Sequence, residues 1–319
     1  MAVALFLREA DVAALAGMDD VIDAVERAFR DYGAGRAVNR PRQRVAVEGG
    51  TLHVMAAGLP AWGVFGLKSY AVTRGGRRFI SLLYSAEDGQ LLAVMEAEEL
   101  GRLRTGAASG VATRYLARAD AGAVGILGTG VQARTQLQAI ARVRPVALVK
   151  AYSRTPARRE AFAEEMVDAL GAEVVAVDSA EEAVADVDII VTITSAREPV
   201  LRGAWLRSGV HVNAAGSNAA GRRELDAEAV GRAARVVVDA RDQAMIEAGD
   251  LLGPVEAGGL SWDRVEELGP IVAGSAPGRR SDDEITLFES QGIALEDVAT
   301  MHLIYTRARE TRKGEEIAR

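Results

Sequence analysis

The sequence contains no cysteine and only three histidines, and both shortages exclude kinds of chemistry. Without cysteine the chain can form no disulfide, no thiolate zinc site and no cysteine nucleophile, which is compatible with a reducing compartment. The histidines, His53, His211 and His302, do not have the spacing of metal ligands. We therefore expect an enzyme or binding protein without a bound metal.

The chain also lacks an excess of basic residues and any long apolar run. Its formal net charge is −7, which provides no electrostatic basis for binding nucleic acid. No apolar run reaches the length of a transmembrane helix. The first residues, M-A-V-A-L-F-L followed by Arg8 and Glu9, have no basic leader of the kind found in signal peptides. These features predict a cytoplasmic protein with no membrane or nucleic-acid partner.

The composition is that of a globular protein with two domains. The 319 residues are 49% hydrophobic and 26% charged. In the first third, an amphipathic helix beginning at Asp19 and Asp20 precedes short strand-like runs separated by glycine turns. These runs lie at 44–47, 52–55, 64–72, 79–84 and 91–95. They predict a mainly antiparallel sheet, followed by a helix over 97–116.

From residue 121 the pattern changes to alternating strands and helices. Buried strands are predicted at 124–127, 146–152, 173–177, 189–193, 211–215 and 236–239, with helices at 157–170, 181–185 and 226–233. This alternation is typical of a doubly wound parallel α/β sheet covered on both faces. A last helix, 293–311, follows this region.

A glycine turn directly after the first of these strands indicates a dinucleotide site. The run Val124–Leu127 leads into G-T-G-V-Q-A, Gly128 to Ala133. Gly128 allows a tight turn, Gly130 lets backbone N–H groups approach a pyrophosphate, and Ala133 allows close packing of the helix. The other residues of this candidate site are Thr129, Val131 and Gln132.

The second strand ends in Ser153-Arg154-Thr155, where NAD-binding proteins have an acidic residue for the ribose 2′-hydroxyl. A hydroxyl, an arginine and a threonine suit the 2′-phosphate of NADP instead. The sequence thus predicts that NADPH is preferred over NADH. Arg154 could also be only a solvated arginine after a strand.

Three further segments carry a resemblance to a known family. They are R-L-R-T-G-A-A-S-G-V-A-T-R-Y-L-A (102–117), H-V-N-A-A-G-S-N-A-A-G-R-R-E-L-D (211–226) and I-T-L-F-E-S-Q-G-I-A-L-E-D-V (285–298). Together with G-T-G-V-Q-A, they make the chain resemble the ornithine cyclodeaminase/μ-crystallin family over nearly its whole length.

The resemblance implies a homodimer and a Rossmann-type domain inserted into a second, α+β domain. Residues 119–293 would bind the nicotinamide cofactor. Residues 1–118 and 294–319 would form the subunit interface and the substrate pocket, with the nicotinamide in the cleft between the domains. Members of the family act on small α-imino or α-amino acids.

The resemblance also assigns roles to individual residues. The carboxylate-binding cations of the family match Arg42, Lys68 and Arg104, which are three of 38 basic residues and could otherwise be surface charges. His53 and Met55 match pocket positions, although His53 could equally be a structural residue of a strand. Further residues expected near the substrate or the cofactor are Ser217, Asn218, Thr105, Thr192, Thr194, Ser290 and Gly292.

The chain departs from ornithine cyclodeaminases in one loop. Their G-x-D-x-P-G-K-x-E appears here as G-S-N-A-A-G-R-R-E, so Asn218 replaces the aspartate. An amide is neither a general base nor a partner for an ammonium group. This substitution and the NADP-like Ser-Arg-Thr both point towards reductases similar to μ-crystallin.

The resulting hypothesis is an oxidoreductase that uses NADPH to reduce the C=N bond of an α-imino carboxylate, such as a cyclic ketimine. Three alternatives remain open: an alanine-type amino-acid dehydrogenase, an ornithine cyclodeaminase, and a non-catalytic, crystallin-like protein that carries NADPH or a ligand.

Overall fold

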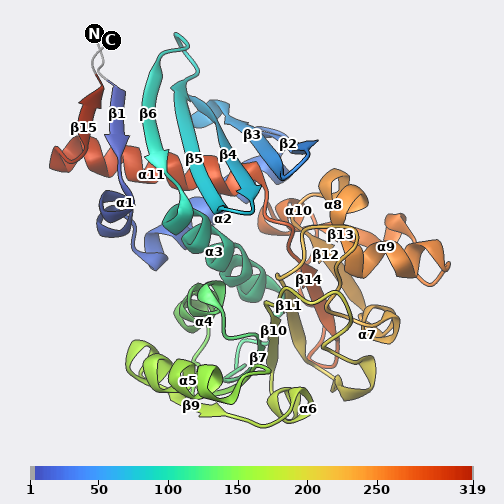
Figure 1. Ribbon diagram of the computed structural model, residues 1–319. Helices are drawn as coiled ribbons and strands as arrows, with labels where there is room; N and C mark the ends of the chain where they lie inside the picture. Colours follow the sequence, from blue (N-terminus) through green and yellow to red (C-terminus); the bar gives the residue numbers. More distant parts are fainter. Residues whose placement is uncertain (1–3, 318–319) are drawn as a thin grey trace. The chain divides into compact units, whose positions relative to one another are not determined.

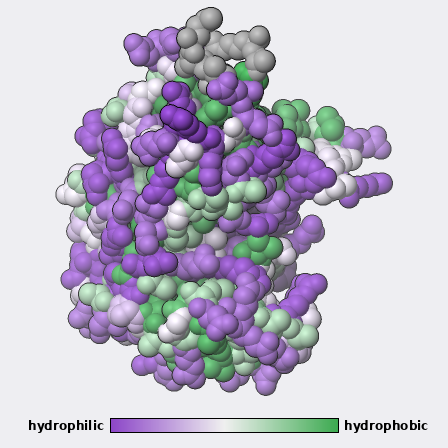
Figure 2. All heavy atoms as spheres, turned by 90° about the vertical axis from the view of Figure 1, so that its left-hand side faces the viewer, coloured by the Kyte–Doolittle hydropathy of each residue, from purple (hydrophilic) through white to green (hydrophobic). Residues whose placement is uncertain are grey.

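The computed structural model describes residues 4–317, which form two compact units. The first unit contains the residues up to Arg104 and those from Ile293 onward, and the second contains Thr105–Gly292. The first three residues of the apolar N-terminal stretch considered above lie outside the described part. Within 4–317 no helix combines the length and the apolar character needed to cross a membrane. Hydrophilic residues predominate on the face shown in Figure 2, with hydrophobic residues scattered between them.

The first unit is built on a seven-stranded sheet with the order β15-β1-β6-β5-β4-β3-β2. Its strands are β1 (Ala4–Leu7), β2 (Val38–Val47), β3 (Gly50–Leu59), β4 (Val64–Thr73), β5 (Gly76–Ser85), β6 (Leu91–Glu96) and β15 (Glu315–Ile317). Strands β2 to β6 form the antiparallel hairpins that the glycine turns predicted. Strand β1 adds a parallel pair with β6, and it pairs with β15 on its other side.

Helices cover one face of this sheet. The long helix α11 (Ala294–Thr311) packs against β2 to β6 and against α2 (Met18–Gly33), while α1 (Glu9–Leu15) packs near β1 and β6 (Figure 1). On the other face the side chains that alternate with the buried ones remain open to solvent. Val38, Leu52 and Phe65 are 47%, 42% and 43% exposed there. The first unit therefore has one covered face and one open, partly apolar face.

The second unit is built on an eight-stranded parallel sheet with the order β13-β12-β14-β11-β10-β7-β8-β9. Its strands are β7 (Ala123–Leu127), β8 (Leu148–Tyr152), β9 (Glu173–Ala176), β10 (Ile189–Thr192), β11 (His211–Ala214), β12 (Arg235–Val238), β13 (Val265–Glu267) and β14 (Thr286–Glu289). Side chains enter hydrophobic cores on both faces: Ile189 and Val191 join one cluster and Ile190 the other. This is the doubly wound sheet that the alternating pattern predicted.

Helices connect these strands and supply the outer layers of both cores. They are α4 (Val131–Val143), α5 (Pro156–Leu170), α6 (Ala180–Val184), α7 (Ala227–Arg232), α8 (Arg241–Glu247), α9 (Gly249–Glu256) and α10 (Leu268–Val272). Helix α3 (Glu98–Leu116) contains the boundary between the units. Its glycines bring it against α4, because a Cβ on Gly106 would lie 2.3 Å from the carbonyl oxygen of Thr135. The G-A-A-S-G run of the motif therefore serves close helix packing.

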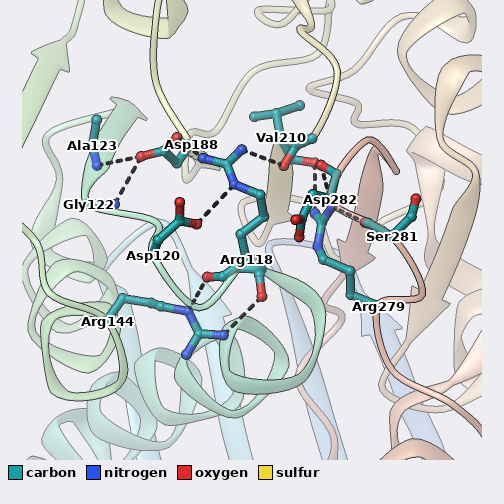
Figure 3. Close-up of polar contacts among 12 residues, drawn as sticks. Arg118, Asp120, Gly122, Ala123, Arg144, Asp188, Val210, Arg279, Ser281 and Asp282 are labelled. Atoms are coloured by element: carbon teal, nitrogen blue, oxygen red, sulfur yellow. Dashed lines mark hydrogen bonds and ion pairs between the residues drawn. The ribbon is translucent and has the colours of Figure 1, made fainter.

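Arginine side chains fix the C-terminal end of α3 to the start of β7 (Figure 3). The guanidinium group of Arg144 donates to the carbonyl oxygens of Thr113, Ala117 and Arg118 at 2.9, 3.0 and 2.7 Å. These acceptors lie in and just after the last turn of α3, where a helix end leaves carbonyl groups in need of donors. Arg118 in turn pairs with Asp188 at 2.6 Å, and Asp188 accepts the N–H groups of Gly122 and Ala123. The strand that leads into the glycine turn is thereby held at its first residue.

Candidate active site

The expected cofactor residues of the second unit gather at one edge of its sheet. Strands β7, β10, β11 and β14 are parallel neighbours, so the loops that follow them emerge on the same side. Ligands of doubly wound sheets bind outside this carboxyl edge. Thr192 is the last residue of β10, and residues 131–132 begin α4. The loops after these strands and after β8 carry residues 128–130, residues 153–155, Thr194, Ser217, Asn218, Ser290 and Gly292. Thr105 lies instead on α3, where its carbonyl oxygen accepts from Gln136.

The turn between β7 and α4 has the geometry of a diphosphate-binding turn. Gly128 has φ +113°, and a Cβ there would lie 2.5 Å from the carbonyl oxygen of Ile193, so only glycine fits. At Gly130 no atom lies within 4 Å of the position of a Cβ, which leaves the backbone open to an approaching ligand. The 13-residue helix α4 begins at the next residue. The diphosphate of a dinucleotide therefore fits this turn.

The end of β8 is tied to the same turn. Thr129 donates its hydroxyl to the hydroxyl oxygen of Ser153 at 2.9 Å. Arg159 donates to the carbonyl oxygen of Ser153 at 3.2 Å and pairs with Asp178. Arg154 and Thr155 are exposed beside them. The segment expected to meet the cofactor ribose is thus held in place while its basic side chain stays accessible.

A buried carboxylate that the sequence analysis did not assign, Glu224, holds two of the loops at this edge. It accepts from the Thr192 hydroxyl at 2.9 Å and from the N–H groups of Thr194 and Gly216 at 2.6 and 2.8 Å. Its side chain therefore joins the ends of β10 and β11. Burial is the main cause that raises the pKa of Glu224 to about 7.

Two further acidic residues hold segments at this edge of the sheet. Asp250 accepts the N–H groups of Glu224 and Leu225 at 2.6 and 2.7 Å, and burial raises the pKa of its carboxyl to about 6. Asp239 accepts the N–H groups of Gln291 and Gly292 at 2.8 and 2.7 Å. A sequence signal existed for Asp239, because it directly follows the buried run V-V-V of β12. A charged group in such surroundings requires partners.

These contacts also show what the loop hydroxyl groups do. Thr192 donates to Glu224, and Ser217 donates to the carbonyl oxygen of Arg222 at 2.9 Å. Both side chains therefore shape the loops from within. Asn218, next to Ser217, is half-buried.

In the first unit, the three expected cations lie in one buried cluster. Lys68, Arg42 and Arg104 are 2%, 5% and 7% exposed. Burial is the main cause that lowers the pKa of Lys68 to about 8, and the positive charges of Arg104 and Arg42 contribute. The cations are therefore close enough to repel one another, and they are not the surface charges that the sequence left possible.

Each of these cations is positioned by a different element. Lys68 lies in β4, paired in register with Met55 of β3 and Ser81 of β5. Arg104 lies on α3, and Arg42 lies in β2, where the register shifts between Arg40 and Gln43. Such irregularities redirect side chains.

Helix α11 supplies two carboxylates to this cluster, which the sequence analysis also left unassigned. Asp297 accepts from Lys68 Nζ at 2.6 Å and forms an ion pair with Arg104, whose Nε lies 2.9 Å away. Glu296 accepts from Arg104 Nη1 at 2.8 Å. The signal was the pair E-D inside the apolar stretch I-A-L-E-D-V-A, since buried acids require cationic or hydrogen-bonding partners. The cluster can bind an anion, and Lys68 can exchange a proton near neutral pH.

His53 and Met55 flank this cluster on β3. The imidazole ring of His53 stacks on Tyr70 with ring centroids 4.2 Å apart. Burial, followed by the charges of Arg44 and Arg42, lowers the pKa of His53 to about 4. The ring is therefore uncharged at neutral pH, which leaves Lys68 as the better proton donor. Met55 is 1% exposed.

A family model described as "Ornithine cyclodeaminase/mu-crystallin family" matches residues 2–312. The chain belongs to this family. It is 36% identical to the Delta(1)-pyrroline-2-carboxylate reductase of Bacillus cereus, over 95% of this chain and 96% of that protein.

Two solved structures extend this similarity to the fold. The reductase of the same name from Thermococcus litoralis, in complex with NADH and L-proline, matches with a TM-score of 0.94 and 39% identity over 98% of this chain and 100% of that one. An archaeal alanine dehydrogenase dimer with bound NAD matches with a TM-score of 0.93 and 36% identity over 99% of both chains. As a member of the ornithine cyclodeaminase/mu-crystallin family, the chain is an oxidoreductase that uses a nicotinamide cofactor.

We predict that Glu224→Gln weakens cofactor binding. The amide presents an N–H group to a site with three donors, so one loop N–H loses its acceptor. A charged hydrogen bond contributes about 1.5–3 kcal/mol, so the dissociation constants of NADPH and NADH should rise by about ten-fold or more. Fluorescence titration of the reduced cofactor measures this change.

The control is Glu198→Gln, which removes an exposed carboxylate 3.7 Å from Arg223 and should leave both constants nearly unchanged. Wild-type affinity in Glu224→Gln would show that Glu224 does not organise the cofactor loops.

Proposed function

We propose that the protein reduces the C=N bond of an α-imino carboxylate, such as a cyclic ketimine, and that it prefers NADPH. The observation that carries this proposal is the buried cluster of Arg42, Lys68 and Arg104. Asp297 and Glu296 pair with Lys68 and Arg104, and they hold these cations in place beside Arg42. Three cations gathered in one place suit a small substrate with an α-carboxylate next to a reducible carbon.

The roles of the cations follow from their chemistry. Arg104 and Arg42 bind the substrate carboxylate, because guanidinium groups form paired hydrogen bonds with carboxylates. Lys68 protonates the imine nitrogen, since a pKa of about 8 leaves its ammonium group able to give up a proton near neutral pH. The nicotinamide cofactor, when bound, supplies the hydride to the imine carbon. Hydride and proton together convert the imine to an amine.

Asn218 supports reduction over cyclodeamination, because its amide cannot serve as a base or pair with a substrate ammonium group. The second candidate is an alanine-type dehydrogenase, which the similarity to the archaeal alanine dehydrogenase supports. Assays with a preformed cyclic imine, with pyruvate plus ammonia, and with ornithine distinguish these functions.

The preference for NADPH rests on residues of this chain. The end of β8 presents the hydroxyl group of Ser153 and the exposed Arg154 and Thr155, with no carboxylate among them. A 2′-phosphate meets an accessible guanidinium group there, and a bare 2′-hydroxyl lacks its usual acidic partner. The two related structures contain NADH and NAD, so both cofactors need to be compared in this chain.

We also propose a homodimer formed through the open face of the first sheet. Val38, Gly58, Phe65 and Tyr84 line an apolar pocket on this face. Contiguous exposed apolar surface marks an interaction site. A second copy of the chain is the occupant we favour, because the related alanine dehydrogenase is a dimer.

The buried cluster of Arg42, Lys68 and Arg104 predicts that the substrate must carry a carboxylate. Wild-type enzyme should reduce a cyclic imine that carries an α-carboxylate far faster than the decarboxylated imine. Arg104→Ala should raise the KM of the acid. It should also lower kcat/KM by an amount equivalent to about 2 kcal/mol or more of transition-state stabilisation, because a charge-assisted contact is lost. Lys68→Arg should retain binding better than turnover, since guanidinium does not release a proton near neutral pH. Steady-state kinetics measure all three effects.

The affinity for NADPH serves as the control in these variants, because Lys68 and Arg104 belong to the first unit and the cofactor loops to the second. Equal rates for both imines in wild type would refute the carboxylate-binding role of the three cations.

Arg154→Ala should weaken NADPH binding by about ten- to a hundred-fold and change NADH binding little, because one charged contact with the 2′-phosphate is lost. The KM values of both cofactors measure this. Arg207→Ala is the matched control, since Arg207 forms an exposed pair with Asp186. Equal preference for the two cofactors in wild type would contradict the assignment.

Phe65→Arg should convert the dimer to monomers, because it places a charge in the open apolar face of the sheet. Sedimentation equilibrium measures the mass. Met245→Arg changes an equally exposed apolar residue of the second unit and should leave the dimer intact. A wild-type monomer would exclude this interface.

A further inference from the structure

Asp297 contacts both Lys68 and Arg104 within the buried cation cluster. We propose that it is a positioning residue, whose carboxylate holds Lys68 and Arg104 at a fixed spacing and keeps Lys68 in its ammonium form for catalysis. The catalytic part of this inference rests on the proposed function, whereas the effect on Lys68 does not.

Both cations lie against the same carboxylate oxygen of Asp297. Oδ1 of Asp297 lies 2.6 Å from Lys68 Nζ and 2.9 Å from Arg104 Nε. The side chain of Asp297 is fully buried, and that of Lys68 is 3% exposed. Strand β4, helix α3 and helix α11 each supply one member of this triad. A movement of Asp297 would therefore change its contacts with both cations.

The charges around Lys68 explain why this contact matters. Arg42 faces it from β2 and Arg104 from α3, and both positive charges favour the neutral amine, as burial does. Strand β3 contributes Met55 and the uncharged His53, and β5 contributes Ser81. Helix α11 contributes the opposing negative charge.

Within α11 the two neighbouring acids have different partners. Asp297 hydrogen-bonds to Lys68 directly and raises its pKa through this bond and through its charge. Glu296 pairs with Arg104, and burial raises the pKa of Glu296 itself. The described contacts therefore assign the protonation of Lys68 to Asp297 and not to its neighbour.

Loss of this carboxylate should produce a neutral amine at position 68 near neutral pH. A neutral amine can neither attract a substrate carboxylate as a cation nor protonate an imine efficiently. Asp297→Asn should therefore move the alkaline limb of kcat/KM to lower pH. A residue that only supports the fold would lower activity without moving this limb.

Lysine titration by NMR tests the inference without any substrate. The sequence has only three lysines, Lys68, Lys150 and Lys313. Lysine labelled with ¹³C at Cε and ¹⁵N at Nζ should thus give three signals from the full-length protein, and Lys150→Arg and Lys313→Arg assign them. In wild type, Lys68 should titrate near pH 8. In Asp297→Asn its midpoint should fall by about 1–3 pH units, as expected for losing an opposite charge in contact.

Glu296→Gln is the matched control, because it removes a buried carboxylate one residue away from Asp297. Of Lys68 and Arg104, it is Arg104 that pairs with Glu296. Its effect on the Lys68 midpoint should be clearly smaller. Asp297→Glu retains the charge and should give a midpoint between those of wild type and Asp297→Asn.

Equal midpoints in Asp297→Asn and Glu296→Gln would overturn the inference. If Asp297→Asn does not fold, wild type still decides: a midpoint below about pH 6, typical of a buried lysine without an anion, would overturn it too. If wild type reduces imines but the Lys68 midpoint does not move in Asp297→Asn, the inference is refuted and the proposed function is not. A moved midpoint without imine reduction refutes the proposed function alone.

Discussion

Both units depend on one electrostatic constraint: a charge that is removed from water must meet a partner of opposite charge or a set of hydrogen-bond donors. Acidic side chains lie inside each unit, and each of them fixes the position or the protonation of neighbouring groups. In the second unit Glu224 and Asp239 accept backbone N–H groups. In the first unit Glu296 and Asp297 accept from the cationic side chains of the cluster.

The two arrangements have different consequences. A carboxylate that accepts backbone N–H groups fixes the path of a loop, so Glu224 sets the ends of β10 and β11 without contributing a reactive group. A carboxylate that accepts from cations sets their protonation and direction. Neither arrangement makes the protein much more stable, because the desolvation of buried ions offsets most of their attraction. Their main effect is to hold loops and cationic side chains in fixed positions.

Much of this molecule could be predicted from local sequence. Gly128 and its flanking strand and helix identified the cofactor turn, because that turn depends on backbone geometry that only glycine allows. Motif resemblance predicted Lys68 and Arg104 as site residues. The ion pair of Lys68 with Asp297 joins residues 229 positions apart, so no periodic pattern in the sequence predicts it. Strand β14 was missed, although β10, β11 and β12 have the same length of four residues and were predicted. The bulge beside Arg42 was missed because a register shift depends on the neighbouring strand.

The position of β14 has a consequence for synthesis of the chain. It lies between β11 and β12 in the sheet, although Thr286–Glu289 follows both of them in sequence. Until these residues leave the ribosome, two interior strands have open edges, and open edges favour pairing with other chains. Helix α11, which covers the first sheet, is made later still. The second unit is therefore complete only after β14 has been synthesised and the first only after α11, and shorter nascent chains expose open strand edges.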